Sequence, residues 1–193
     1  MIPGFSKKSA PGGLSEGSKF QVSEVKAKNS EALLALRREV LGDEVKNWRD
    51  DDPYSPLFFD EFEGIGTHLV VKSVSDGKAV AYGRITHALS MRRSSEWAKA
   101  FHLDVFSGEA LEHTVIFSKV MVASPYHKSE PAIVLMTKLY ESALDSSKAW
   151  IAVMLSNLNE FNFNRFLGFR PLMRIEHSPF GGWRIPLFLI VHD

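Results

Sequence analysis

The sequence has 193 residues, which suits one globular domain with a buried core. Its 45% hydrophobic and 24% charged residues are ordinary for a soluble protein, and 23 basic residues balance 23 acidic ones, so the net charge does not favour nucleic acid or an anionic membrane as a partner. The chain contains no cysteine, which excludes disulfides, thiolate catalysis and zinc–thiolate sites.

Residues 1–19 are rich in Gly, Ser, Pro and Lys, a composition that predicts a flexible N-terminal tail rather than a secretory signal. Residues 20–193 show no internal repeat and no further boundary, so we expect them to form a single domain. No segment approaches the roughly 20 apolar residues that span a bilayer. We therefore expect a cytoplasmic protein.

Hydrophobic periodicity and turn signals divide the domain into strands and helices. In chain order, they predict a strand over 19–28, a helix over 31–41, strands over 67–74 and 78–88, a short helix around 95–101, a strand over 114–124, a helix over 131–146, a strand over 149–155, a helix over 157–167, and strands over 169–176 and 183–191. Residues 43–63 form an acidic, aromatic loop whose length indicates a functional role. The order predicts an α/β fold, with a mixed central sheet flanked by helices on both faces.

Residues 118–132, SKVMVASPYHKSEPA, contain the most specific local signal. An apolar strand ends at Val122, a polar loop follows, and a helix begins near Pro131. Free backbone N–H groups and the helix dipole at such a junction favour negative charge. The alternative interpretation is a plain strand–loop–helix connection, which any α/β protein contains.

This loop resembles the pyrophosphate loop of the GNAT (GCN5-related N-acetyltransferase) superfamily, which grips the phosphopantetheine arm of acyl donors. The positions in register are Val122, Tyr126, His127 and Ala132, whereas Lys128 and Glu130 replace glycines. A second resemblance follows at Asn157, Phe163, Leu167, Gly168 and Phe169, with Asn164 in place of the tyrosine that many members use as a general acid. The resemblance implies that the donor is bound by Val120, Val122, His127, Lys128, Ser129, Ala132 and Asn157.

The N-terminal half resembles the acyl-homoserine-lactone synthases and the related N-acyl amino acid synthases. Their charged network around the acceptor site corresponds here to Arg37, Trp48, Asp60, Glu63 and Arg84, and Phe101 belongs to the same ordered series. The resemblance implies that these six residues bind the acceptor beneath the 43–63 loop. Taken singly, each charge is more often a solvated surface residue, but the ordered series favours the functional interpretation.

The predicted catalytic residues come from the strand that precedes the loop. The family's Glu-x-Ser-Arg becomes Ile116-Phe117-Ser118-Lys119, so Ser118 is kept and the glutamate expected to act as general base is lost. Strand alternation places Glu112 on the same side as Ser118 if the strand begins early enough. Glu112 is therefore the predicted base, and His113, on the opposite side, is the alternative.

Together these features predict an N-acyltransferase with a GNAT-like fold. The acyl group would move from a phosphopantetheine thioester, on acyl carrier protein or coenzyme A, to the amine of a small molecule such as an amino acid. No permanently bound cofactor or metal is expected, because the histidines lack a ligand spacing and Asp50-Asp51-Asp52 lacks the Gly and Glu of a calcium loop. The alternative is a non-catalytic GNAT-like module that binds an acyl thioester or a protein.

Overall fold

The computed structural model describes residues 18–25, 31–45, 60–145, 149–178 and 183–191. Their elements are β1 (Phe20–Val25), α1 (Glu31–Val45), β2 (Thr67–Ser73), β3 (Ala79–His87), α2 (Ala88–Met91), α3 (Ser95–Ala100), α4 (Gly108–Glu112), β4 (Thr114–Val122), α5 (Glu130–Asp145), β5 (Ile151–Ser156), α6 (Phe161–Phe166), β6 (Arg170–Pro171), β7 (Glu176–His177) and β8 (Trp183–Ile190). Short 3-10 turns, η2 (Leu103–Val105) and η3 (Ser124–Tyr126), connect some of them. Trp48 and nearly all of the expected N-terminal tail lie outside the described residues.

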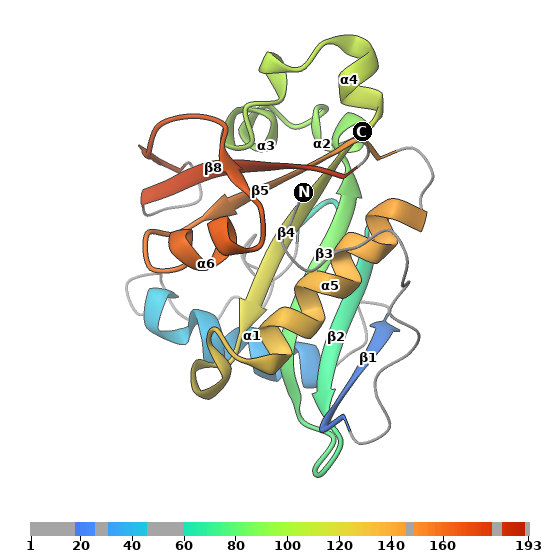
Figure 1. Cartoon of the computed structure of the whole chain (residues 1–193), viewed down its shortest axis with the longest axis vertical. Helices are drawn as coiled ribbons and strands as arrows, with labels where there is room; N and C mark the ends of the chain where they lie inside the picture. Colours follow the sequence, from blue (N-terminus) through green and yellow to red (C-terminus); the bar gives the residue numbers. More distant parts are fainter. Residues whose placement is uncertain (1–17, 26–30, 46–59, 146–148, 179–182, 192–193) are drawn as a thin grey trace.

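The strands form one mixed sheet in the order β1-β2-β3-β4-β5-β8-β6, and β7 also pairs with β8 (Figure 1). The pairs from β1 to β4 are antiparallel, β4 and β5 are parallel, and β5 and β8 are antiparallel. A parallel pair needs a crossover, and α5 supplies it between β4 and β5. The predicted α/β class and mixed sheet are confirmed.

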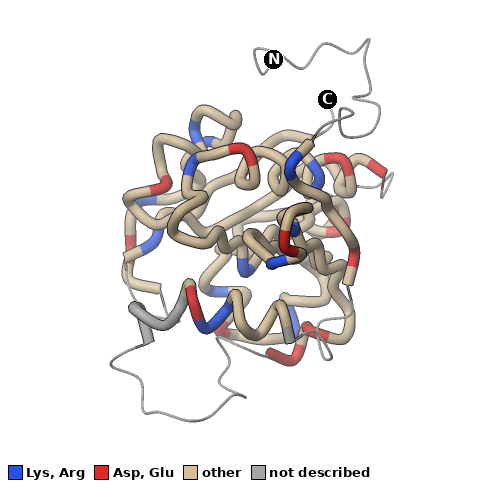
Figure 2. Tube along the Cα trace, turned by 90° about the horizontal axis from the view of Figure 1, so that it is seen from below, with Lys and Arg blue, Asp and Glu red and all other residues tan. Residues whose placement is uncertain are grey.

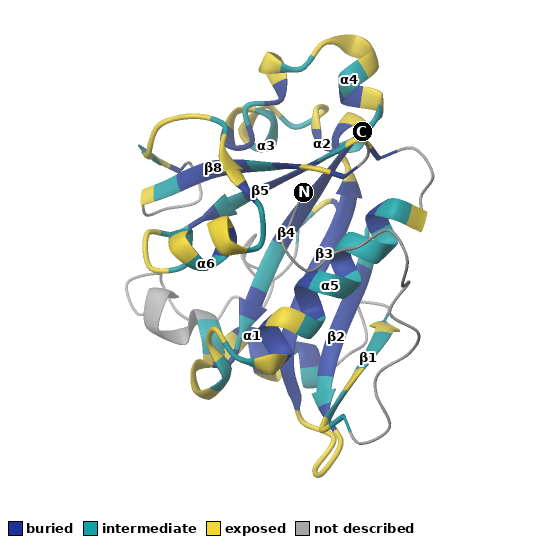
Figure 3. Cartoon of the chain, in the orientation of Figure 1, coloured by how far each residue is buried: buried dark blue, intermediate teal, exposed yellow. Residues whose placement is uncertain are grey.

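Alternating side chains divide the core between the two faces of the sheet. Figure 3 shows that β3 at the centre of the sheet is almost entirely buried. Leu69 and Val71 of β2 belong to the cluster that includes Leu139 of α5. Val70, between them, packs with Leu36 of α1 on the opposite face. A third buried cluster joins the α2–α4 region to Ile116 and Val153. Helices thus cover both faces, as the sequence predicts.

Two boundaries affect the site, and one of them differs from the prediction. The strand predicted over 114–124 begins at Thr114, and residues up to Glu112 form α4, which Ser107 caps by accepting from the Ala110 N–H, so the earlier start that would place Glu112 on the strand is not observed. The helix expected from residue 157 begins at Phe161 instead. Here the Asn157 side chain accepts a hydrogen bond from the backbone of Glu160 at 2.8 Å and holds a turn ahead of the helix.

A bulge and a divergence in β4 create the space for a site. Tyr82 pairs with Met121 and Arg84 with Ser118, so residues 119 and 120 both face residue 83. Lys119 has a φ of 52°, in the left-handed region. The β4–β5 pairing ends at Phe117 opposite Met154, while β5 continues beside β8 to residue 156. Beyond that point β4 and β5 separate and leave a gap in the sheet.

Candidate active site

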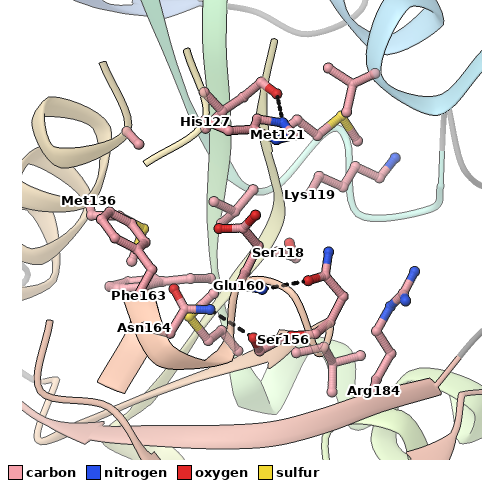
Figure 4. Close-up of a pocket in the computed structure, with 18 of the residues that line it drawn as sticks. Ser118, Lys119, Met121, His127, Met136, Ser156, Glu160, Phe163, Asn164 and Arg184 are labelled. Atoms are coloured by element: carbon pink, nitrogen blue, oxygen red, sulfur yellow. Dashed lines mark hydrogen bonds between the residues drawn. The ribbon is translucent and has the colours of Figure 1, made fainter. Parts of the chain in front are cut away.

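A cavity of about 580 Å³ fills the gap between β4 and β5, and we call it the central cleft (Figure 4). Its walls come from the separating halves of β4 and β5, the loop before α5, the first turns of α5, α6, and single residues of α1, α3 and β8. The lining residues are Val40, Trp97, Phe101, Phe117, Ser118, Lys119, Val120, Met121, Val122, His127, Lys128, Ala132, Met136, Met154, Leu155, Ser156, Asn157, Glu160, Phe163, Asn164, Ser178 and Arg184.

Backbone groups along one wall of the cleft lack a strand partner. No strand in the described part of the chain pairs with the β5-facing edge of β4 beyond Phe117. Unpaired backbone groups in a partly buried cleft need acceptors or donors from a ligand or water. This edge can therefore receive an extended polar chain, and its N–H groups can stabilise an oxyanion.

More backbone N–H groups of the loop before α5 are hydrogen-bonded within the loop than the sequence predicts. The N–H groups of His127, Ser129 and Ala132 already bond to backbone carbonyls of the same loop, and Pro131 has no N–H. Within residues 127–132, the backbone N–H groups of Lys128 and Glu130 remain without a hydrogen-bond acceptor in the described structure. Lys128 adopts a φ of 56°. An anion at this loop would thus meet two free amides and the Lys128 ammonium.

Six of the seven predicted donor-binding residues line the cleft: Val120, Val122, His127, Lys128, Ala132 and Asn157. Ser129 does not line it but shapes the loop, because its hydroxyl donates to the Tyr126 carbonyl at 2.6 Å. His127 joins the loop to the end of β4 through an Nε2–H bond to the Val122 carbonyl at 2.6 Å. The structure brings these residues together, and their role in donor binding remains a prediction.

A buried cluster of charges lies against β4, and we call it the charge network. It comprises Arg37, Asp60, Glu63, Arg84 and Lys119. These five residues come from four separate segments of the chain: α1, the 60–66 turn, β3 and β4. The fold brings them within ion-pair distance of one another. Figure 2 shows that charges of both signs are intermixed along the trace, without a large field of one sign.

The distances in the network are those of strong, charge-assisted bonds. Arg84 Nη1 lies 2.6 Å from Asp60 Oδ1, and Lys119 Nζ lies 2.6 Å from Glu63 Oε1. Arg37 Nη2 contacts both carboxylate oxygens of Glu63 at 3.2 Å. The side chains of Arg37 and Arg84 are completely buried. Removing Glu63 would take a carboxylate away from Arg37, Arg84 and Lys119 at once in the interior.

A chain of hydrogen bonds extends the network through two neutral groups. Arg37 Nη2 donates to the Tyr82 hydroxyl at 2.7 Å, and that hydroxyl donates to His68 Nδ1 at 2.7 Å. His68 Nε2 then donates to the Glu63 carbonyl at 3.0 Å. This direction of donation requires a neutral imidazole with its proton on Nε2. Burial lowers the pKa of His68, which agrees with the neutral form.

Burial also affects the pKa values of Tyr82, Lys119 and Asp60. It raises the pKa of Tyr82 to about 12 and lowers the pKa of Lys119 below its usual value. For Asp60, burial alone would raise the pKa, but the hydrogen bond and charge of Arg84, with the charge of Lys119, more than offset it, so the pKa is lowered. Asp60 is therefore a stable anion, suited to hold cations in place.

The network and the cleft meet on β4. Ser118 and Lys119 line the cleft, and the Ser118 hydroxyl accepts from Arg84 Nε at 2.9 Å. Phe101 lines the cleft as well, whereas Arg37, Asp60, Glu63 and Arg84 lie behind the wall. The four predicted acceptor-binding charges are thus brought together, but the described structure places them one layer back from the cavity.

The predicted position of Glu112 is wrong. Glu112 is the last residue of α4, is exposed and does not line the cleft, so it does not share a strand face with Ser118. His113, the alternative, stacks on Trp150 at 3.9 Å and also lies outside the lining. Sequence reasoning missed Glu160, which does line the cleft. The sequence spacing could have indicated it, since Glu160 precedes the cleft residues Phe163 and Asn164 by one helical turn.

The Asn164 side chain is fixed in the floor of the cleft. It is buried and donates to the Ser156 hydroxyl at 2.8 Å, and this hydroxyl donates to the Asn157 carbonyl at 2.9 Å. Figure 4 shows both residues beside the cavity. An amide does not titrate, so Asn164 orients the floor and cannot serve as a proton donor in place of tyrosine.

Among the described residues, no group of three or more His, Asp or Glu side chains has the arrangement of a metal site. The same residues contain no helix with the length and hydropathy that crossing a bilayer requires.

Several solved structures of acyl- and acetyltransferases share this fold. The sequence itself matches no protein-family model and no curated protein. FeeM, an N-acyl amino acid synthase from uncultured soil microbes, superposes with a TM-score of 0.66 at 15% identity, over 89% of this chain and 91% of that one. An acyl-CoA N-acyltransferase from Pseudomonas aeruginosa gives 0.59 at 16% identity, over 88% and 99%. The yncA structure from Salmonella typhimurium, solved with its cofactor acetyl-CoA, gives 0.60 at 17% identity, over 91% and 96%. The GNAT-like fold that the sequence predicts is therefore confirmed.

Proposed function

We propose that this protein is an N-acyltransferase that moves an acyl group from a phosphopantetheine thioester to the amine of a small molecule such as an amino acid. One observation carries the proposal: β4 and β5 separate beyond Phe117 and Met154, and the resulting cleft has free backbone groups on one wall. FeeM, an N-acyl amino acid synthase, and the acyl-CoA N-acyltransferase from Pseudomonas aeruginosa support the same class of reaction.

The donor would lie along the cleft with its phosphate region at the loop before α5. Free N–H groups at Lys128 and Glu130, together with the α5 dipole, favour an anion there. The pantetheine arm would follow the open edge of β4, and the thioester carbonyl would face an N–H group near Val120 or Val122. A backbone N–H group in this position donates a hydrogen bond to the oxyanion that forms when the amine attacks, and so stabilises it.

The acceptor would bind where the charge network meets the cleft, at Ser118 and Lys119. Arg84 lies behind the cleft wall and would act through Ser118, because its Nε donates to the Ser118 hydroxyl at 2.9 Å. The network's other bonds would hold this side of β4 rigid during the reaction. Rigid positioning matters because direct attack on a thioester depends mainly on orientation and a neutral amine.

The test is a product assay. The protein is incubated with acetyl-, octanoyl- and palmitoyl-CoA, or with the matching acyl carrier proteins, and with a panel of amino acids and simple amines. The proposal expects free thiol and an N-acyl product, both detected by mass spectrometry. No thioester consumption above background with any donor would contradict it.

A second candidate is a non-catalytic module that binds an acyl thioester. Ile116 and Asn164 favour it, because neither can transfer a proton at positions where the family places a glutamate and a tyrosine. Calorimetry separates the two candidates: coenzyme A binding without any product would support the module.

A further inference from the structure

We propose that Glu160 is the proton-transfer residue of the central cleft, an inference that rests on the proposed acyl transfer. It would take a proton from the attacking amine and return it to the leaving thiolate. No prediction from the sequence assigned a role to this residue.

Glu160 is the one acidic residue among the described residues that line the cleft. The other nearby carboxylates are engaged, since Asp60 and Glu63 are held by Arg84, Arg37 and Lys119 within the network. Neither of these two carboxylates lines the cavity. Glu160 therefore provides a carboxylate that can accept a proton from a substrate in the cleft.

The Glu160 carboxylate has no hydrogen bond or ion pair in the described structure, although its backbone is firmly held. Its N–H donates to Asn157 Oδ1 at 2.8 Å, and its carbonyl accepts from the Asn164 N–H at 2.9 Å. The side chain is half-buried and does not cap α6. Figure 4 shows it directed into the cavity. A fixed backbone with a free carboxylate is an arrangement that suits proton transfer rather than structural support.

Glu160 lies near Asn164, which replaces the tyrosine that many family members use as a general acid. It is the N-cap residue of α6, four residues before Asn164, and both side chains line the cleft. Ile116 is buried in the third core cluster and offers no polar atom. One carboxylate at the cleft would then serve both stages of the reaction.

The step balances as follows. The amine nitrogen forms a bond to the thioester carbonyl carbon, and its excess proton moves to the Glu160 carboxylate. The tetrahedral intermediate collapses with cleavage of the C–S bond. The protonated Glu160 gives its proton to the thiolate, so that the products are an amide and a free thiol and the carboxylate is regenerated. No oxidant, reductant or metal is required.

The test measures thiol release from octanoyl-CoA, with a mixture of the common amino acids as acceptors, for Glu160→Gln and Glu160→Ala. General acid–base catalysis contributes roughly 10²–10⁴-fold, so we expect kcat to fall by about 100-fold in both variants while KM for octanoyl-CoA stays within a few-fold. Added formate should restore part of the activity of Glu160→Ala and none of Glu160→Gln. A structural role would not produce this rescue.

The matched control is Glu109→Gln, which removes an exposed carboxylate of α4 outside the cleft and should leave the rate unchanged. Parent activity that persists unaltered in Glu160→Gln and Glu160→Ala would overturn this inference alone. A parent protein without thiol release from any donor would overturn the proposed function and this inference with it.

Discussion

The charge network and the central cleft both adjoin β4, and they differ in how their polar groups are satisfied. Within the network, every charged side chain contacts an opposite charge, and the groups are almost entirely buried. Within the cleft, the Glu160 carboxylate and the Lys128 N–H have no partner in the described structure, and a strand edge is open. The network is thus built to be rigid, and the cleft is built to receive a ligand. Changes to the network should act on stability first, and changes to the cleft should act on binding and turnover.

The largest effect should follow from breaking the network at Glu63. Glu63→Gln removes the carboxylate that contacts Arg37 and Lys119, and breaking a buried ion pair costs about 3–5 kcal/mol of unfolding free energy. The measurement is urea denaturation followed by circular dichroism. Glu141→Gln, which breaks the exposed Lys138 pair at 3.1 Å, is the control and should unfold like the parent. Equal effects of the two variants would show that the network is not structurally important.

A smaller loss of stability should follow from Gly66→Ala. A Cβ at Gly66 would lie 2.8 Å from Cγ and Cδ of Arg84 and 2.9 Å from the Thr86 hydroxyl, so Arg84 would have to shift. Overpacking of this kind costs roughly 1–3 kcal/mol, again measured by urea denaturation. Gly64→Ala is a close control, because nothing lies within 4 Å of its new methyl group. The comparison would be refuted by a Gly64→Ala variant as unstable as Gly66→Ala.

On the cleft side, Lys128→Glu should weaken binding without affecting the fold. Reversing the charge beside two free amides should reduce the affinity for coenzyme A by about 10-fold, or ~1.4 kcal/mol, with more effect at low salt. Calorimetry at two ionic strengths provides the measurement, and denaturation provides the control for stability. Unchanged affinity would mean that the phosphate does not bind at this loop.

The smallest effect should be the pH dependence that His68 contributes. Because the pKa of His68 is lowered from its ordinary value of 6.5, the unfolded state binds the proton more readily than the folded state. The stability contribution is therefore present above pH 6.5 and is lost as the pH falls towards the lowered pKa. Unfolding free energies of the parent and of His68→Gln between pH 5 and 7.5 should converge as the pH decreases. If the two plots of unfolding free energy against pH ran parallel, the neutral His68 in the series of hydrogen bonds from Arg37 through Tyr82 would be contradicted.

The two regions also differ in how well the sequence predicts them. Arg37, Asp60, Glu63 and Arg84 were selected as an ordered series, and the structure joins them in one network. Such a network can be predicted because each charged residue is recognised in the sequence by its type. Its depth behind β4 was not predictable, since burial depends on packing of α1 and the 60–66 turn against the sheet.

Predictions for the cleft were less complete, for local reasons. Gly77, between β2 and β3, and Gly168, after α6, adopt φ values of 69° and 98°, a conformation that strongly selects glycine. The predicted start of this strand at residue 114 agrees with β4, but alternation alone did not exclude an extension to Glu112, which fits a strand pattern and a helix end equally well. Glu160 was overlooked because its direction depends on where α6 begins, and the Asn157 side chain sets that boundary.

We expect the cleft between the separating ends of β4 and β5 to hold a phosphopantetheine thioester. A crystal grown with a non-hydrolysable thioether analogue of octanoyl-CoA would test it most directly. We expect electron density for the pantetheine arm between residues 118–122 and 154–157, with the pyrophosphate at the N–H groups of Lys128 and Glu130. Density for the analogue at any other surface, with the cleft empty, would contradict the account.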